Sequence, residues 1–197
     1  MKRVRCFVAI ELGPRVVDSL VLVAEAIRSA DPTWRGEKWV AAENLHITLK
    51  FLGDLPETSL PLFAEDLSAA VAKLQTFELV PSQVDARPSA FRARMIWVAF
   101  ADQSGGFRTL SEAVDVLASN YGIERERRAP TAHATLARAR KPRHFAEAAI
   151  EAGSTALGAS ASPMSVSCAT LFTSTLTRSK PVYERVAVAG LEHAATE

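Results

Sequence analysis

The sequence has only two cysteines in 197 residues, no apolar run of membrane-spanning length, and a formal net charge of only +1. Two cysteines are too few for a disulfide framework, and short apolar runs exclude a membrane-spanning helix. The near-neutral charge gives no global attraction to nucleic acid. The apolar stretch near the N-terminus ends at Glu11, too short for a secretory signal. Cys6 and Cys168 lie in apolar, strand-like runs, so we expect buried free thiols and a cytoplasmic protein.

Histidine is also scarce, and two of the four histidines open the same short pattern. The pattern His-x-Thr-Leu occurs at His46–Leu49 and again at His133–Leu136. In both places apolar and polar residues alternate, which is typical of a strand with one buried face. Side chains two apart on a strand share a face, so each histidine projects together with its threonine. This repetition is the strongest functional signal in the sequence.

Strand-like and helix-like segments recur in the same order in two parts of the chain. Amphipathic helices are expected from 14 to 31, 56 to 74, 107 to 121 and 142 to 151. The stretch 153–163 is rich in Ala, Ser and Gly and is expected to be a loop. Strands are expected at 4–12, 38–40, 45–53, 77–84, 95–100, 133–138, 165–173 and 182–188.

The spacing of these segments indicates a duplication. The similar strands around Val8 and Val98 lie 90 residues apart, and the two motif histidines lie 87 apart. We therefore expect halves at roughly 4–90 and 94–190, forming interleaved lobes of a single domain, 1–197. A doubly wound parallel sheet is the alternative for strands separated by helices. The first strand lacks a glycine-rich phosphate turn and each half has too few strands, so an α+β fold is favoured.

Two imidazoles that face each other across a cleft suit general acid–base catalysis, because imidazole titrates near neutral pH. Threonine hydroxyls on the same face can donate hydrogen bonds to phosphoryl oxygens. A 2′,3′-cyclic phosphate suits such a site, since water attacks phosphorus on one side while the leaving sugar oxygen takes up a proton on the other. His46, Thr48, His133 and Thr135 are therefore the candidate site. The two motifs are nearly equivalent and do not by themselves assign the acid and the base.

Three other uses of these residues stay open. A metal site would need further ligands, but no third histidine, cysteine or paired carboxylate stands at ligand spacing, so we expect neither a metal nor another cofactor. A non-catalytic nucleotide- or RNA-binding module is possible, although a binder needs no acid–base pair. An esterase for small-molecule cyclic phosphates is the remaining alternative.

The stretch Glu43–Gly53, with His133–Arg138, resembles the 2H phosphoesterase superfamily, and within it the RNA 2′,3′-cyclic phosphodiesterases, once named 2′-5′ RNA ligases. The resemblance runs from about Arg5 to Val188. It implies a bilobal α+β fold, with two pseudo-symmetric lobes of antiparallel sheet around a central cleft and helices on the outside. Members commonly carry proline just before the second histidine, where this chain has Ala132.

The resemblance also implies an activity, namely hydrolysis of an RNA-terminal 2′,3′-cyclic phosphodiester to a 2′-phosphomonoester without ATP or metal. It makes His46 the proton donor and His133 the proton acceptor. RNA ends or cyclic-phosphate nucleotides are the expected substrates, with no membrane partner. No heptad or large apolar patch is evident in the sequence, so a monomer is expected.

Basic residues near the two motifs are further candidates for substrate binding. Lys50 shares the face of His46 if the first motif strand is regular. Arg127 and Arg128 belong to the basic segment 125–143 and are candidates for contacts with the RNA backbone. Arg138 falls on the face opposite its histidine in a regular strand, so we expect a structural role for it.

Overall fold

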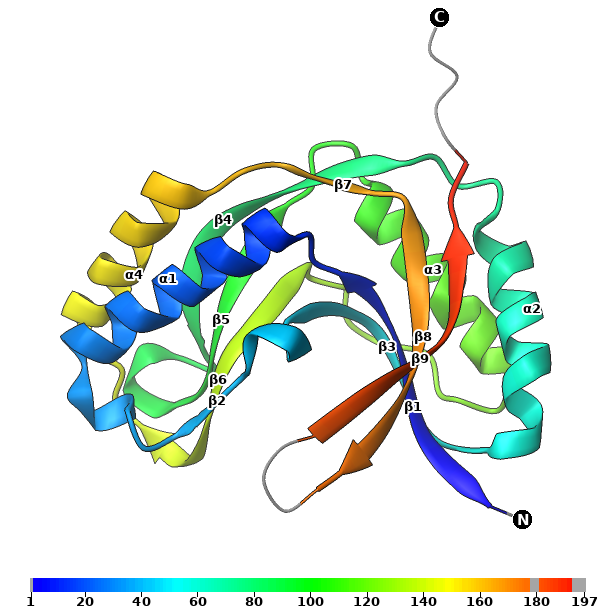
Figure 1. Cartoon of the computed structure of the whole chain (residues 1–197), viewed down its shortest axis with the longest axis horizontal. Coiled ribbons are helices and arrows are strands. Elements are labelled where there is room, and N and C mark those ends of the chain that lie inside the picture. The colour runs from blue at the N-terminus through cyan, green and yellow to red at the C-terminus, as the bar shows by residue number, and fades with distance from the viewer. Residues whose placement is uncertain (1, 178–180, 193–197) are drawn as a thin grey trace, which may run out of the picture.

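In the computed structural model, which describes residues 2–177 and 181–192, nine strands form one sheet (Figure 1). Their order across the sheet is β7-β4-β5-β6-β3-β1-β8-β9, and the short β2 pairs with β6. Neighbouring strands are antiparallel. The strands are β1 (Arg3–Glu11), β2 (Lys38–Trp39), β3 (His46–Pro56), β4 (Phe77–Arg87), β5 (Ala93–Ala101), β6 (His133–Arg143), β7 (Met164–Val166), β8 (Cys168–Leu176) and β9 (Pro181–Gly190).

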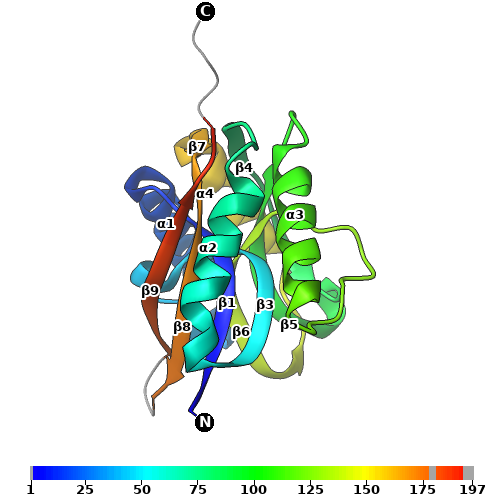
Figure 2. The ribbon, with the colours of Figure 1, turned by 90° about the vertical axis from the view of Figure 1, so that its right-hand side faces the viewer.

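Four α-helices of the described residues lie on the outside of this curled sheet (Figure 1). They are α1 (Pro14–Ala30), α2 (Leu60–Val71), α3 (Gly106–Asn120) and α4 (Glu147–Ser160). Helix α1 packs along α4 on one side, whereas α2 lies beside α3 on the other, next to β9 and β3 (Figure 2). Helices α1, α2 and α3 bury the apolar stripes that their sequences predict. The predicted α+β fold, with antiparallel strands and outer helices, is confirmed.

The two sequence halves exchange their last strands. Strand β4 of the first half pairs with β5 of the second, and β8 of the second half pairs with β1 of the first. One lobe therefore contains β1, β3, β8 and β9 with α2 and α3, and the other contains β4, β5 and β6 with α1 and α4. Because neither half closes a lobe alone, we propose that the chain folds as one domain.

The two lobes are joined across the sheet where β3 meets β6. A single residue pair, Ile47 and Ala134, connects these strands, and both residues are fully buried. By contrast, β1 pairs with β3 over nearly the full length of both strands. From Leu136 onward β6 pairs with β2 instead of β3, so β3 and β6 diverge at the place where both His-x-Thr motifs lie.

Helix α4 begins and ends later than its sequence predicts, because the expected start at residue 142 lies in β6 and the helix begins at Glu147. The helix continues to Ser160, so the loop expected at 153–163 is wrong. Ala149, Gly153 and Leu157 recur every four residues and are buried along one face. A Cβ added at Gly153 would stand 2.9 Å from Cγ1 of Ile27 in α1. The glycine thus allows close helix packing rather than a turn.

The strand expected at 165–173 is divided in two. Strand β7 pairs with β4, whereas β8 pairs with β1, so the chain passes from one lobe to the other at Ser167. The stretch around Ser167 contains no glycine or proline that would indicate a change of strand partner. The division has no other sequence signal.

Both cysteines are free thiols, as expected. Cys6 is buried, whereas Cys168 is only half-buried. Burial raises the pKa of the Cys6 thiol to about 11, so it stays protonated near neutral pH. Within the described ranges, no helix is both long and apolar enough to cross a membrane.

The length of α4 can be tested through its second glycine. Gly158 is exposed, with open space where a Cβ would stand. Alanine favours a helix over the unfolded chain, so we expect Gly158→Ala to raise the free energy of unfolding by about 0.5–1 kcal/mol in urea titrations. Gly153→Leu is expected to lower it by about 1–3 kcal/mol, because the site is already filled. No gain from Gly158→Ala would contradict a helix at this position.

Candidate active site

The four motif side chains lie on one face of the sheet at the β3–β6 junction. Extending the register of Ile47 and Ala134 by one residue sets Thr48 opposite His133, and His46 opposite Thr135. All four then project away from the buried face. The histidines are diagonal neighbours, a relation that separates Cα atoms by about 7–8 Å in a regular pair.

Each imidazole is oriented by the backbone two residues before it. Nδ1 of His46 lies 2.7 Å from the carbonyl oxygen of Asn44, and Nδ1 of His133 lies 2.8 Å from that of Thr131. A carbonyl only accepts, so Nδ1 carries the hydrogen in both rings. Nε2 is therefore the atom that gains or loses a proton. Nε2 of His46 lies 3.0 Å from Oγ1 of Thr48.

Both imidazoles are held toward the neutral form. Burial lowers the pKa of His46 below its ordinary value, and the nearby charges of Arg138 and His133 add to this. Burial also lowers the pKa of His133, with Arg138 and Arg87 adding to it. The backbone hydrogen bonds oppose these effects without outweighing them. A bound anion would reverse the shift by favouring the charged ring.

An aromatic residue stands against each histidine at matching places in the two halves. The Phe7 ring in β1 lies 5.0 Å from that of His46, and the Trp97 ring in β5 lies 4.0 Å from that of His133. Phe7 and Trp97 are 90 residues apart, the offset of the duplicated strands. Neither was expected from the sequence to reach the site, although the offset was a usable signal.

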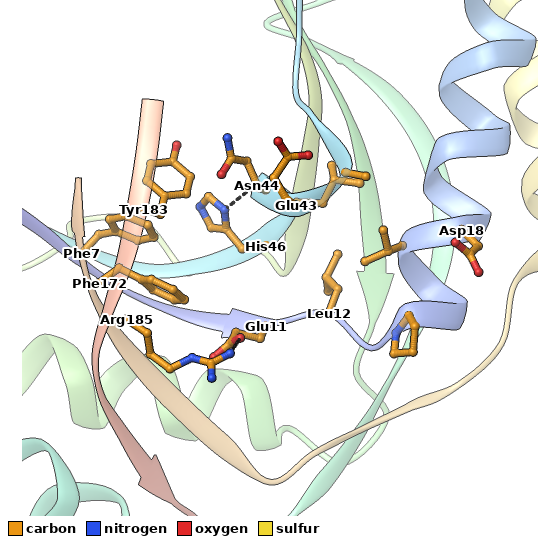
Figure 3. Close-up of a pocket in the computed structure, with 14 residues that line it drawn as sticks. Phe7, Glu11, Leu12, Asp18, Glu43, Asn44, His46, Phe172, Tyr183 and Arg185 are labelled. Atoms are coloured by element: carbon orange, nitrogen blue, oxygen red, sulfur yellow. Dashed lines mark hydrogen bonds and ion pairs between the residues drawn. The ribbon is translucent and has the colours of Figure 1, made fainter. Parts of the chain in front are cut away.

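The hollow beside His46 is aromatic and partly acidic (Figure 3). Phe7, Phe172 and Tyr183 stand together on one side of the imidazole, and Glu11 pairs with Arg185 next to them. The Tyr183 ring meets that of His46 edge-on at 5.5 Å. This surface suits a flat, uncharged group such as a nucleobase.

The hollow beside His133 is strongly basic. Its lining includes Trp97, Met95 and four arginines, with no acidic side chain among the residues described: Arg87, Arg94, Arg128 and Arg138. The Arg87 guanidinium lies 4.7 Å from the centre of the Trp97 ring. Four cations around a cavity of about 800 Å³ attract a polyanion even on a chain of near-neutral charge.

A bulge in each motif strand moves the residues that follow the threonine. Thr48 pairs with Ala9 and Lys50 with Val8, so Leu49 is an extra residue in β3. Leu136 is the extra residue of β6 in the same way, between the partners of Trp97 and Ile96. After each bulge, side chains that a regular strand would place on the histidine face point to the buried face, and the reverse. Two neighbouring residues are consequently buried in each strand, Leu49 with Lys50 and Leu136 with Ala137.

The bulges overturn two expectations. Lys50 does not share the face of His46, because the bulge turns it to the buried side, where its ammonium lies 2.7 Å from Asp115. Arg138 is on the histidine face rather than opposite it, and its charge acts on both imidazoles. Of the two loop arginines, Arg128 lines the basic hollow, whereas the exposed Arg127 pairs with Glu124.

Comparison with known proteins agrees with these features. The model of the family described as LigT-like phosphoesterase matches residues 14–97. The chain is 28% identical to an RNA 2′,3′-cyclic phosphodiesterase of Methanothermobacter thermautotrophicus, over 92% of this chain and 95% of the relative. It is 29% identical to a protein of the same name from Aeropyrum pernix, over 75% of this chain and 82% of the relative.

Solved structures share the fold at lower identity. A crystal structure from Thermus thermophilus has a TM-score of 0.77 at 23% identity, covering 95% of this chain and 97% of that one. The complex of E. coli LigT with 3′-AMP has a TM-score of 0.72 at 21% identity, covering 96% and 99%. Both comparisons thus point to proteins of one class, with the solved structures sharing the fold and the family model matching the first half of the chain. More specifically, the chain is similar to LigT-like phosphoesterases, through the family model over residues 14–97 and through relatives at 28–29% identity.

The electrostatic role of Arg138 gives a direct test. Removing its charge should raise the pKa of both His46 and His133, because a nearby cation disfavours the charged rings. We expect Arg138→Met to move both imidazole titrations, followed by NMR, to higher pH. Arg140→Met is the control on the same strand, since Arg140 instead bonds to Gly36. A shift of only one histidine, or of neither, would contradict a shared position beside Arg138.

Proposed function

We propose that this protein hydrolyses RNA-terminal 2′,3′-cyclic phosphates to 2′-phosphates by two-histidine general acid–base catalysis. The observation that carries this proposal is the pairing of Ile47 with Ala134, which sets two His-x-Thr motifs symmetrically on one face. Each imidazole then presents Nε2, the same reactive atom. The names of the relatives support the same reaction class.

The reaction needs two proton transfers on opposite sides of phosphorus. In the proposed step, Nε2 of His133 accepts a proton from water as the water oxygen bonds to phosphorus. The bond from phosphorus to the 3′ oxygen breaks, and Nε2–H of His46 gives its proton to that oxygen. The 2′-phosphate and a 3′ hydroxyl result. The Thr48 hydroxyl lies beside Nε2 of His46, and the Thr135 hydroxyl donates a 3.4 Å hydrogen bond to Sδ of Met95. In the proposed step, both hydroxyls donate to phosphoryl oxygens instead.

The electrostatic asymmetry of the site supports this assignment of roles. The hollow beside His133 is lined by four arginines, whereas the hollow beside His46 includes the acidic side chains of Glu11 and Glu43. More positive charge around His133 favours its neutral form, which a base requires. The anionic substrate would raise the pKa of His46 and so supply the protonated acid.

The basic hollow supports RNA rather than a small cyclic phosphate as substrate. A mononucleoside cyclic phosphate offers one phosphate to the two histidines, whereas an RNA strand carries further phosphates for Arg94 and Arg128. The aromatic hollow beside His46 suits the terminal base.

We propose a metal-independent cytoplasmic monomer, in keeping with its free cysteines. Among the described residues, no three His, Cys, Asp or Glu side chains are grouped to hold a metal ion.

Loss of either histidine should abolish most of the activity. We expect His46→Ala and His133→Ala each to reduce the rate by about 10² or more on short RNAs ending in a 2′,3′-cyclic phosphate, because each removes one proton transfer. Product analysis should give the 2′-phosphate, and activity should persist in EDTA. His144→Ala is the matched control, since that exposed side chain packs against Phe91 in another part of the molecule.

The same assay separates the competing functions. Near-wild-type rates in either variant would end the two-histidine mechanism, and loss of activity in EDTA would favour a metal enzyme. Tight binding of nucleotides without turnover of any cyclic phosphate would identify a binding module. Faster turnover of ADP-ribose 1″,2″-cyclic phosphate than of RNA ends would identify a small-molecule esterase.

Arg94 and Arg128 test the contribution of the RNA strand. We expect the double variant Arg94→Met and Arg128→Met to raise KM for an RNA oligonucleotide and to leave KM for a mononucleoside 2′,3′-cyclic phosphate nearly unchanged. The slope of log affinity against log salt should fall by roughly 0.7 per lost phosphate contact. Arg108→Met is the control, because Arg108 is exposed on α3 and pairs with Glu112. Equal effects on both substrates would contradict a strand-binding role.

A further inference from the structure

A buried lysine lies directly behind the candidate site. Lys50 is only 3% exposed and follows Thr48 by two residues. Its Nζ lies 2.7 Å from Oδ1 of Asp115, 2.7 Å from the carbonyl oxygen of Glu124 and 3.1 Å from Oε1 of Glu126. The three hydrogens of one ammonium group therefore each have an acceptor.

Asp115 extends this cluster to the same segment of chain. Its Oδ2 accepts from Nε of Arg125 at 3.1 Å, and its Oδ1 accepts from the backbone N–H of Glu126 at 3.1 Å. The segment 124–126 is thus held through its backbone and its side chains by one buried ion pair between β3 and α3. Arg127 and later residues are not part of the cluster.

The segment held in this way begins the connection from α3 to β6. Six residues beyond it, the carbonyl oxygen of Ala132 accepts from the backbone N–H of Phe100. Between these anchors lies Arg128 of the basic hollow. Thr131, whose carbonyl orients the ring of His133, comes directly before the second anchor. The cluster therefore holds the first residues of the loop 124–132, which leads directly into His133 at the start of β6.

The other end of the linkage is the first motif itself. The bulge at Leu49 turns Lys50 from the histidine face to α3, so the strand that positions His46 also holds this loop. Apart from this linkage, β3 and β6 share one residue pair. A single pair leaves the relative position of two strands poorly defined, and a polar link with fixed acceptors defines it more closely.

An apolar residue would fill the same space at less cost. Burial alone lowers the pKa of Lys50, but the carboxylates of Asp115 and Glu126 outweigh it and raise the pKa above its ordinary value. A buried ion pair often stabilises a fold no better than packed apolar side chains of the same volume. Its particular contribution is directional, because it selects one arrangement of the groups that it joins.

We propose that Lys50 is a positioning residue, which sets the loop 124–132 against the first motif strand and so places His133 relative to His46. The activity part of this inference rests on the proposed function. The loop part does not, because the position and order of residues 124–132 can be measured without substrate.

The test compares Lys50→Met with Lys2→Met in the full chain. Lys2 forms a 2.7 Å ion pair with Glu57, but that pair is exposed, so the control removes the same atoms away from the site. Lys50→Met should lower kcat by about 10- to 100-fold and change KM less than about threefold, because small misplacements act mainly on the chemical step. It should also shift or broaden the His133 ring resonances and speed amide exchange at 124–132. Lys2→Met should do neither.

A second variant covers failure to fold. Lys50→Met combined with Asp115→Asn leaves no unpaired buried charge, so it tests the linkage even if the single variant is unstable. Wild-type kcat and unchanged His133 resonances in a folded variant would overturn the proposal. If the wild-type protein hydrolyses no cyclic phosphate, the proposed function fails, and the resonances and amide exchange still decide the role of Lys50.

Discussion

The whole arrangement depends on one contact between two strands. Ile47 and Ala134 form the pair that joins β3 to β6, and both are fully buried where the two lobes meet. Because side chains alternate along a strand, burying these two residues forces His46, Thr48, His133 and Thr135 onto the opposite face. Because only one pair joins the strands, β3 and β6 diverge from it, and the four side chains on this face are half-buried rather than covered. Core packing and access to the site are thus two consequences of the same contact.

The two histidines have the same orientation and the same kind of neighbours because the two halves are symmetric around this contact. They differ in the charge of the hollows beside them. Each ring is tied through Nδ1 to a carbonyl two residues earlier and lies against an aromatic residue of the neighbouring strand. Around that common frame, one hollow is lined by aromatic and acidic side chains and the other by arginines. Two similar strands with differently charged surroundings suit a reaction that needs an acid and a base on opposite sides of one atom.

The bulges at Leu49 and Leu136 set the composition of the face. Each bulge exchanges the faces of the residues that follow, so Arg138 joins the site and Lys50 leaves it for the interface with α3. Strict alternation predicts the reverse for both residues. One bulge therefore brings the Arg138 cation toward the imidazoles, and the other turns Lys50 to the carboxylates of Asp115 and Glu126 behind the sheet.

The sequence alone was sufficient for the periodic features. Alternation gave the strands, helical stripes gave the helices, and the repeated His-x-Thr pattern with its constant offset gave the four central residues and the α+β class, because these signals are local. The C-terminal part of α4 was not predicted, because Ala, Ser and Gly occur both in loops and in close helix contacts. Gly153 makes such a contact with Ile27. Strand partners, the two bulges and the convergence of four arginines on one hollow were decided by the tertiary structure. Each of these depends on which distant segment lies alongside, and that information is absent from any local pattern of residues.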